Sequence, residues 1–113
     1  MVRWPADLVM AQFDVYPNPN PASSASIPFL VNVQSDLLDQ LPSRLMMPLS
    51  RVGVGKGAPR RLARTFEVNG ENLALLAHLA APVEVRLLKK AVASLAGSSH
   101  EFIDALDAVI SGV

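Results

Sequence analysis

The chain has 113 residues, with ten lysines and arginines balanced by ten aspartates and glutamates, no cysteine, and an apolar content of half its residues. A chain of this length forms one domain, and its zero formal charge excludes a strongly basic nucleic-acid-binding coat. Without cysteine there is no disulfide framework, thiolate nucleophile or thiolate zinc site, and so large an apolar fraction favours a subunit that covers one face in an oligomer.

The amino-terminal segment MVRWPADLVM carries Pro5 and Asp7 where a signal peptide needs an unbroken apolar stretch, so we expect no export signal. The longest apolar run, Leu73 to Val83, is interrupted by His78 and is much shorter than the roughly 20 residues of a bilayer span. Together with the lack of cysteine, these features fit a protein of the reducing cytoplasm.

Two short strands and a polar loop are predicted in the first third of the chain. Alternation of apolar and polar residues over Gln12–Tyr16, and again over Phe29–Gln34, is typical of half-buried strands. The tract between them, residues 17–28, is rich in proline and serine. It predicts a mobile surface loop.

The segment SDLLDQLPSR predicts a turn or one irregular helical turn that leaves Leu37 and Leu38 near the surface. Arg44–Leu49 follows and is apolar and strand-like. Because Pro48 has no amide proton to donate to a ladder, we expect this strand at an edge of the sheet or at a bulge.

A long surface excursion followed by a tight hairpin is predicted next. Ser50–Thr65 holds three closely spaced glycines, five cations and no acid. Asn69 and Gly70 then separate Phe66–Val68 from Glu71–Leu76. Since Asn-Gly accepts the two positive φ angles of a type I′ turn, this is the strongest hairpin signal in the chain.

The run LALLAHLAAPVEVRLL, residues 73–88, is ambiguous, because leucine and alanine favour helix while the later alternation favours strand. We predict two strands that bend at Pro82. Beyond it, Ser98 and Glu101 are spaced as a capping box, and an amphipathic helix of about three turns should end one residue before Ser111. Its apolar residues recur at helical spacing: Phe102, Ile103, Leu106, Val109 and Ile110.

Taken together, the strings QFDVY, FLVNVQSDLLD, RLMMPL and APVEV, with a terminal helix and a short glycine-containing tail, resemble the CcdB family of toxins. The most specific string is VQSDLLD. The resemblance covers Ala11 to Val113. We expect residues 1–9 to be a disordered or non-native extension and residues 10–113 to form a single CcdB-like toxin domain.

The resemblance implies a β-dominated α+β fold: a small, strongly bent antiparallel sheet or barrel, as in CcdB, Kid and MazF, with one C-terminal α-helix. It implies a homodimer that binds the A subunit of DNA gyrase and traps the enzyme on cleaved DNA. A CcdA-like antitoxin is the second implied partner. Such a toxin makes or breaks no bond itself, so no enzymatic activity, cofactor, membrane partner or sequence-specific nucleic acid is expected.

The resemblance also implies where the partners bind. Residues expected to contact gyrase are Asp107, Ile110, Ser111, Gly112 and Val113 at the end of the helix and in the tail, together with Leu37 and Leu38. The best-known family tail carries a tryptophan, a frequent interface anchor, where this chain has Ser111, and an amide where it has Asp107. For the antitoxin we expect contacts from Arg51, Arg60 and Arg61, because arginine pairs well with carboxylates; DNA phosphates or plain solvent are the alternatives for this loop.

Two other functions stay open at this point. Related mRNA interferases of the Kid and MazF type cut RNA, and Arg44 or the pair Arg60 and Arg61 would have to supply their catalytic groups. An inactive toxin relic that still binds antitoxin is the other alternative. Neither His78 nor His100 has a second ligand at metal-binding spacing, so no metal site is expected. Of the two methionines beside Pro48, we expect at least one, Met46 or Met47, in the core, with the dimer seam open to the other.

Overall fold

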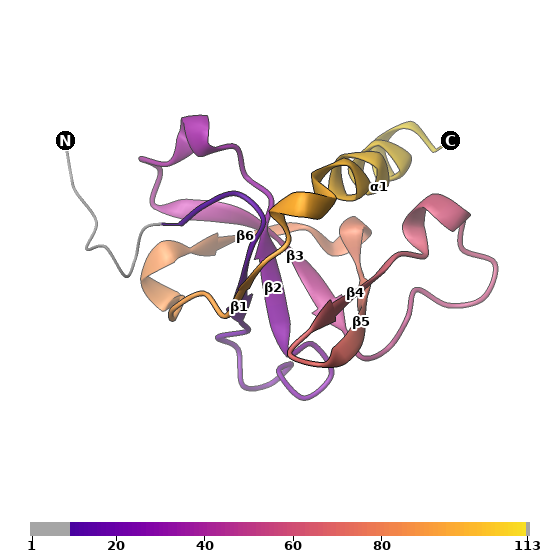
Figure 1. Cartoon of the computed structure of the whole chain (residues 1–113), viewed down its shortest axis with the longest axis horizontal. Helices are drawn as coiled ribbons and strands as arrows, with labels where there is room; N and C mark the ends of the chain where they lie inside the picture. The colour runs from indigo at the N-terminus through magenta and orange to yellow at the C-terminus, as the bar shows by residue number, and fades with distance from the viewer. Residues whose placement is uncertain (1–9, 113) are drawn as a thin grey trace.

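The computed structural model describes residues 10–112 and shows one strongly bent antiparallel sheet with a single α-helix lying across it (Figure 1). The predicted fold class is therefore confirmed. The strands run in the order β4-β5-β3-β2-β1-β7, and β6 pairs with β3. Their bounds are β1 (Asp14–Pro17), β2 (Phe29–Asn32), β3 (Ser43–Ser50), β4 (Thr65–Val68), β5 (Glu71–Leu75), β6 (Ala81–Glu84) and β7 (Ala93–Ser94), and the helix is α1 (Ser99–Ser111).

Alternating side chains give the sheet two apolar faces. Val31 of β2 and Met47 of β3 belong to the larger core, which also holds Phe102 of α1. Their sequence neighbours Leu30 and Met46 belong to a smaller core on the opposite face. Both methionines are thus in the core of one chain, at 1% and 0% exposure, and neither is left for a dimer seam.

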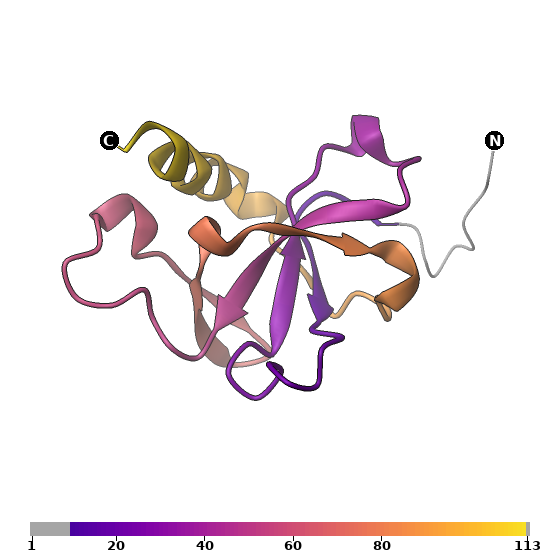
Figure 2. The same ribbon diagram turned by 180° about the vertical axis from the view of Figure 1, so that it is seen from behind.

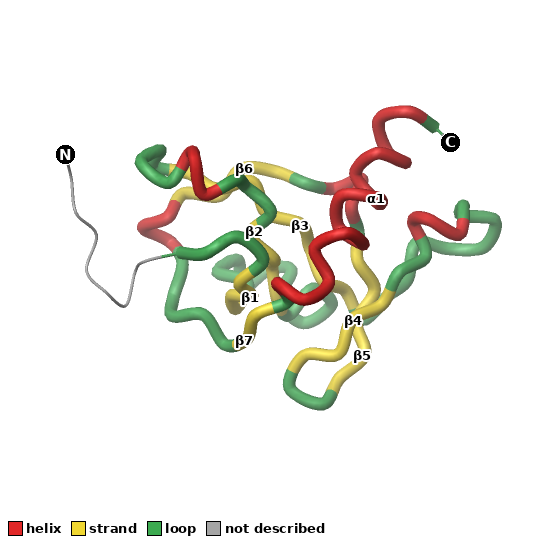
Figure 3. The backbone as a smooth tube through the Cα atoms, turned by 45° about the horizontal axis from the view of Figure 1, so that its top comes forward, coloured by secondary structure: helices red, strands yellow, loops and turns green. Residues whose placement is uncertain are grey.

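Three stacked phenylalanines join the two ends of the sheet. Phe102 lies with its ring centroid 5.3 Å from that of Phe13, just before β1, and 4.6 Å from that of Phe66 in β4. Since β4 and β1 are far apart in the strand order, α1 bridges the open side of the sheet (Figure 3). Phe13 has a φ of 71° and precedes β1, so the first strand is shorter than the predicted Gln12–Tyr16.

The prediction that Pro48 lies at an edge or bulge is wrong. β3 pairs with β2 along one side, and on the other side with β6 through Met46 and with β5 from Leu49 onward. Pro48 lies in the gap between β5 and β6, where its carbonyl accepts a hydrogen bond from the Leu76 amide at 3.0 Å. Because the Pro48 nitrogen faces this gap, no ladder hydrogen bond is lost there, and a central strand tolerates the proline.

The hairpin at Asn69 and Gly70 is confirmed, with φ angles of 51° and 80°. The predicted bend at Pro82 is wrong, because the chain turns earlier, through the 3-10 helix η4 (Ala77–Leu79). Pro82 lies inside β6, opposite Leu45, on a strand whose one ladder in the described part of the chain is to β3 (Figure 2).

The helix begins differently from its prediction and buries a different face. Ser98 ends the 3-10 helix η6 (Ala96–Ser98), and its side chain makes no capping hydrogen bond, so the capping box is wrong. The buried residues of α1 are Phe102, Ala105 and Ala108, whereas the bulky Ile103 and Ile110 are 54% and 76% exposed. Small alanines let the helix approach the sheet closely. Within residues 10–112, no helix is both long and apolar enough to cross a membrane.

Candidate functional site

The end of α1 presents an exposed apolar residue on a helix that is fixed at its other end. Ile110 is 76% exposed, and Asp107 one turn earlier is also exposed. The Ser111 hydroxyl donates to the Asp107 carbonyl at 2.7 Å. Gly112, with a φ of 71°, closes the helix by donating from its amide to the Ala108 carbonyl at 3.0 Å. Val113, the last predicted contact, lies outside the described residues.

Ile110 belongs to an apolar stripe that also contains Ile103, whose exposure was not predicted. Ile103 precedes it by seven residues and therefore shares its side of the helix. Val109, at 38% exposure, lies beside them. A surface apolar stripe on a terminal helix is typical of a protein interface rather than of a core.

Leu37 and Leu38 lie near the surface as predicted, on the 3-10 helix η2 (Asp36–Leu38), with Leu37 92% exposed. Ser35 caps this turn by accepting from the Leu37 amide at 3.2 Å, and the Gln34 side chain donates to the Leu38 carbonyl at 3.2 Å. In Figures 1 and 3, η2 and the end of α1 lie apart along the longest axis. Within one chain, therefore, the two predicted gyrase-contacting groups form separate surfaces.

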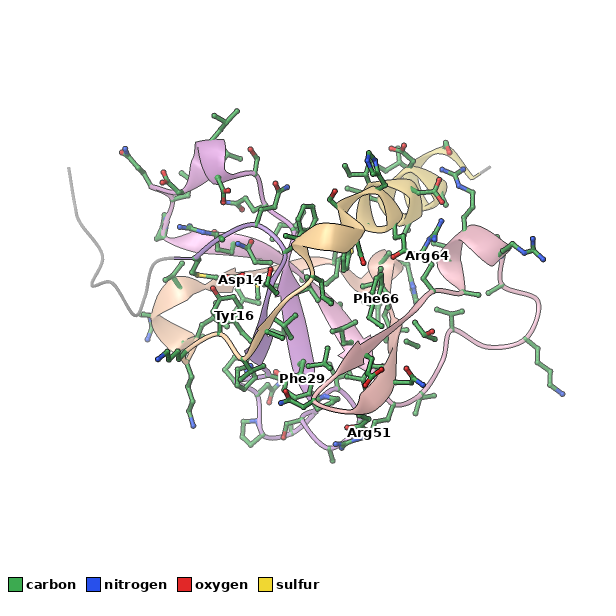
Figure 4. All side chains as sticks on the ribbon, in the orientation of Figure 1. Asp14, Tyr16, Phe29, Arg51, Arg64 and Phe66 are labelled. Atoms are coloured by element: carbon green, nitrogen blue, oxygen red, sulfur yellow. The ribbon has the colours of Figure 1, made fainter. Side chains whose placement is uncertain are left out.

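Arg51, one of the three arginines predicted to meet the antitoxin, already has a partner in this chain. Its guanidinium forms an ion pair with Glu71 of β5 and donates to the Ala25 carbonyl at 2.5 Å (Figure 4). The hydrogen bond from Arg51 lowers the pKa of the Glu71 carboxyl, and the same bond raises the pKa of the arginine. This contact joins the start of the basic loop to the hairpin.

Arg61, in the 3-10 helix η3 (Arg60–Leu62), is bound to α1. Its Nε donates to Asp104 Oδ1 at 2.8 Å, and its Nη2 donates to the Asp104 carbonyl at 3.1 Å. Arg64 forms a second ion pair with the same carboxylate and lies 3.5 Å from Glu101. Hydrogen bonds from Arg61, and then from Arg64, lower the pKa of Asp104. Asp104 therefore fastens the loop to α1.

Arg60, the third predicted antitoxin contact, is exposed and has no ion pair within residues 10–112. Lys56 in the same loop is also exposed and has no ion pair in that range. The predicted cation cluster therefore divides into paired arginines at its ends and two unpaired cations.

Arg44, the residue considered for RNA cleavage, is buried at 3% exposure. Its guanidinium donates to three backbone carbonyls, those of Asp39, Leu41 and Ser43, at 2.5, 2.5 and 3.0 Å. These contacts hold the segment after η2 against β3. A guanidinium enclosed by carbonyls cannot reach an RNA substrate, so Arg44 has a structural role here.

Three further titratable side chains, those of Tyr16, His78 and His100, form no ion pair within residues 10–112. The Tyr16 hydroxyl is buried and has no hydrogen-bond partner among the described residues. Burial, and then the charge of nearby Asp14, raises the pKa of Tyr16 to about 12 (Figure 4). His78 and His100 are exposed, and residues 10–112 contain no group of three or more histidine, aspartate and glutamate side chains placed to hold a metal ion.

A comparison with family models matches residues 12–112 to the family described as CcdB protein. No curated protein matches the chain. Because the match spans nearly the whole chain, the protein belongs to the CcdB family, a family of toxins from toxin–antitoxin systems. The resemblance based on the VQSDLLD string and the terminal helix is thereby confirmed.

Proposed function

We propose that this member of the CcdB family binds the A subunit of DNA gyrase with the end of α1 and traps gyrase on cleaved DNA. The observation that carries the proposal is the exposed Ile110 at the end of a helix whose other end is anchored by Phe102. A rigid helix that presents an apolar side chain loses little conformational entropy on binding.

The chemistry of the helix end fits a protein partner. Ile110 supplies apolar contact area, and Asp107 supplies a charged acceptor one turn away. Gly112 has no side chain, so a partner backbone can approach the end of the helix closely. Val113, outside the described residues, is the last contact that we propose.

We place the chain in a two-fold homodimer whose seam leaves the apolar stripe of α1 uncovered, so that Ile110 can reach gyrase. In a two-fold dimer the same patch is used by both subunits, so two helix ends would be presented together to a two-fold symmetric target. Leu37 and Leu38 on η2 supply a second gyrase contact in this proposal, on a surface separate from the helix end of the same subunit.

The antitoxin is the second partner in this proposal, and it binds the basic loop through Arg51, Arg60 and Arg61. Arg60 is available at once. Arg51 and Arg61 would exchange their own carboxylate partners, Glu71 and Asp104, for those of the antitoxin. Both ion pairs remain accessible to water, where such pairs are weak, so the exchange meets little resistance.

A gyrase cleavage and supercoiling assay tests the target. We expect the purified protein to inhibit supercoiling and to accumulate cleaved DNA. Deletion of Ser111–Val113, or Ile110→Asp, should abolish both effects. Leu87→Asp is the matched control, because Leu87 is also exposed, at 47%, but lies in the 3-10 helix η5 (Val85–Leu87), away from α1. Inhibition that survives the truncation, or that Leu87→Asp removes equally, would refute the assignment of the helix end.

One observation favours the toxin relic as a second candidate. The Ser111 hydroxyl bonds to its own helix, so it supplies no outward anchor where the best-known family tail has tryptophan. A relic would bind antitoxin and leave gyrase active. In that case Ser111→Trp should restore inhibition, because a central tryptophan contributes about 2 kcal/mol or more at a protein interface.

A further inference from the structure

The basic loop and β5 line an open pocket that is separate from the end of α1. Residues 53–55 face the segment 62–65 and Ala74 of β5 across a cavity of about 240 Å³. Val54, Leu62 and Ala74 give it apolar walls, and Gly53 and Gly55 leave open space beside them. An apolar cavity of roughly 150 Å³ already holds benzene, so this pocket has room for one large apolar side chain.

A charged side chain also borders the pocket. Arg64 lines it, and the Arg64 Nε is buried without a hydrogen-bond partner in the described part of the chain. The other guanidinium nitrogens of Arg64 contact Asp104 and Glu101. The buried Nε does not reach the open space of the pocket, so Arg64 contributes positive charge to the pocket wall rather than a hydrogen bond to an occupant.

The charge around the pocket selects the kind of occupant. Residues 50–65 contain five cations and no acid. Glu71, Glu101 and Asp104 are paired with Arg51, Arg61 and Arg64, whereas Glu67, on the same face of β4 as Thr65, has no ion pair within residues 10–112. Lys56, next to Gly55, and Arg60, two residues before Leu62, add positive charge that no carboxylate of residues 10–112 neutralises by an ion pair. The rim is therefore complementary to an acidic partner.

We propose that this pocket and its rim, which we call the loop pocket, bind an acidic segment of a partner protein that inserts one large apolar side chain. The apolar side chain fills the space between Val54 and Leu62, and flanking carboxylates pair with Lys56 and Arg60. The inference rests on the proposed function in that the antitoxin would carry this segment, and it specifies the chemistry of that segment.

The test measures fluorescence polarisation of a labelled glutamate-rich peptide with one central leucine, titrated with the full chain. Lys56→Glu combined with Arg60→Glu should weaken binding about tenfold, since two attractive contacts become repulsive. Lys89→Glu combined with Lys90→Glu is the matched control, because it changes the net charge equally at exposed lysines outside the loop. We expect this control to weaken binding less than about twofold at physiological salt, where charges beyond about 8 Å are screened.

A second comparison separates the pocket from the rim. Val54→Asp should weaken binding much more than Val52→Asp, because Val52 is in the same loop, 65% exposed, and does not line the pocket. A peptide with serine in place of its leucine should bind the unmodified chain about tenfold more weakly, as expected for the loss of a buried leucine side chain. Each of three results would overturn the proposal. They are an equal loss of binding in the two double charge variants, an equal loss in the two valine variants, and unchanged binding of the peptide that has serine in place of leucine.

A gyrase cleavage assay on the same variants keeps the two proposals distinguishable. Loop-pocket variants that lose the peptide and still poison gyrase support a site separate from the helix end. If the protein binds the peptide as described but has no effect on gyrase, the gyrase proposal is refuted and the loop-pocket proposal is supported.

Discussion

Replacement of Phe102 by alanine is the sharpest test of how α1 is held on the sheet. Phe102 is 2% exposed and stacks on both Phe13 and Phe66. Truncation of a buried phenylalanine costs about 3–5 kcal/mol. Because this ring has two aromatic partners, each pair being worth about 0.5–1.5 kcal/mol beyond its buried area, we expect a loss of about 4 kcal/mol in the free energy of unfolding.

The assay is urea denaturation at a fixed protein concentration, followed by far-UV circular dichroism. With a urea dependence of about 2 kcal/mol per molar, the midpoint should fall by about 2 M. Ile103→Ala is the control on the next residue, which is 54% exposed, and it should cost less than about 1 kcal/mol. A loss below about 2 kcal/mol for Phe102→Ala, or a loss no larger than that of Ile103→Ala, would refute the view that the aromatic stack anchors the helix.

Three other substitutions test individual polar contacts. Tyr16→Phe should keep or raise stability at neutral pH by about 1 kcal/mol, because it removes an unpaired buried hydroxyl. The folded pKa of Tyr16 is raised from 10.0 to about 12. The unmodified chain should therefore lose stability as the pH rises between those values, and the variant should not. Asp104→Asn should lower stability at neutral pH, and because the folded pKa of Asp104 is lowered, the difference from the unmodified chain should shrink in acid as pH falls through the ordinary value of 3.8 toward the lowered one. Arg44→Met should cost about 3 kcal/mol in urea unfolding, because three backbone carbonyls lose their donor, and an unchanged midpoint would contradict the structural role of Arg44.

Features that depend on neighbours in sequence could be predicted. The hairpin at Asn69 and Gly70 follows from the φ angles that those two residues accept, and the structure has both angles positive. The exposed turn with Leu37 follows in the same way from a short run bounded by serine and proline. Each needs only local backbone preferences.

Features that depend on pairing between residues distant in sequence could not be predicted. A proline in a strand indicates an edge unless a gap in the neighbouring strands receives it, and the gap opposite Pro48 is formed by a turn about 30 residues later. Likewise, a capping box needs Ser98 at the start of a free helix, but a 3-10 turn already contains that residue. Local spacing does not report either circumstance.

The candidate site shows the same limit. The helical spacing of bulky apolar residues on α1 did not show that Ile103 is exposed, nor that the sheet accepts the small residues Ala105 and Ala108 instead. The partnership of Arg61 with Asp104 spans 43 residues. Fewer cations of this loop are available to a partner than the sequence indicates, because three of the five form ion pairs within the chain.

The central position of β3 should also determine how the domain unfolds. It shares one side with β2 and divides the other between β5 and β6, and it contributes one methionine to each apolar face. Unfolding of either half of the domain removes backbone hydrogen bonds and apolar contacts from β3. The other half then loses the strand with which it pairs. We expect the two halves to unfold together, in a single cooperative transition.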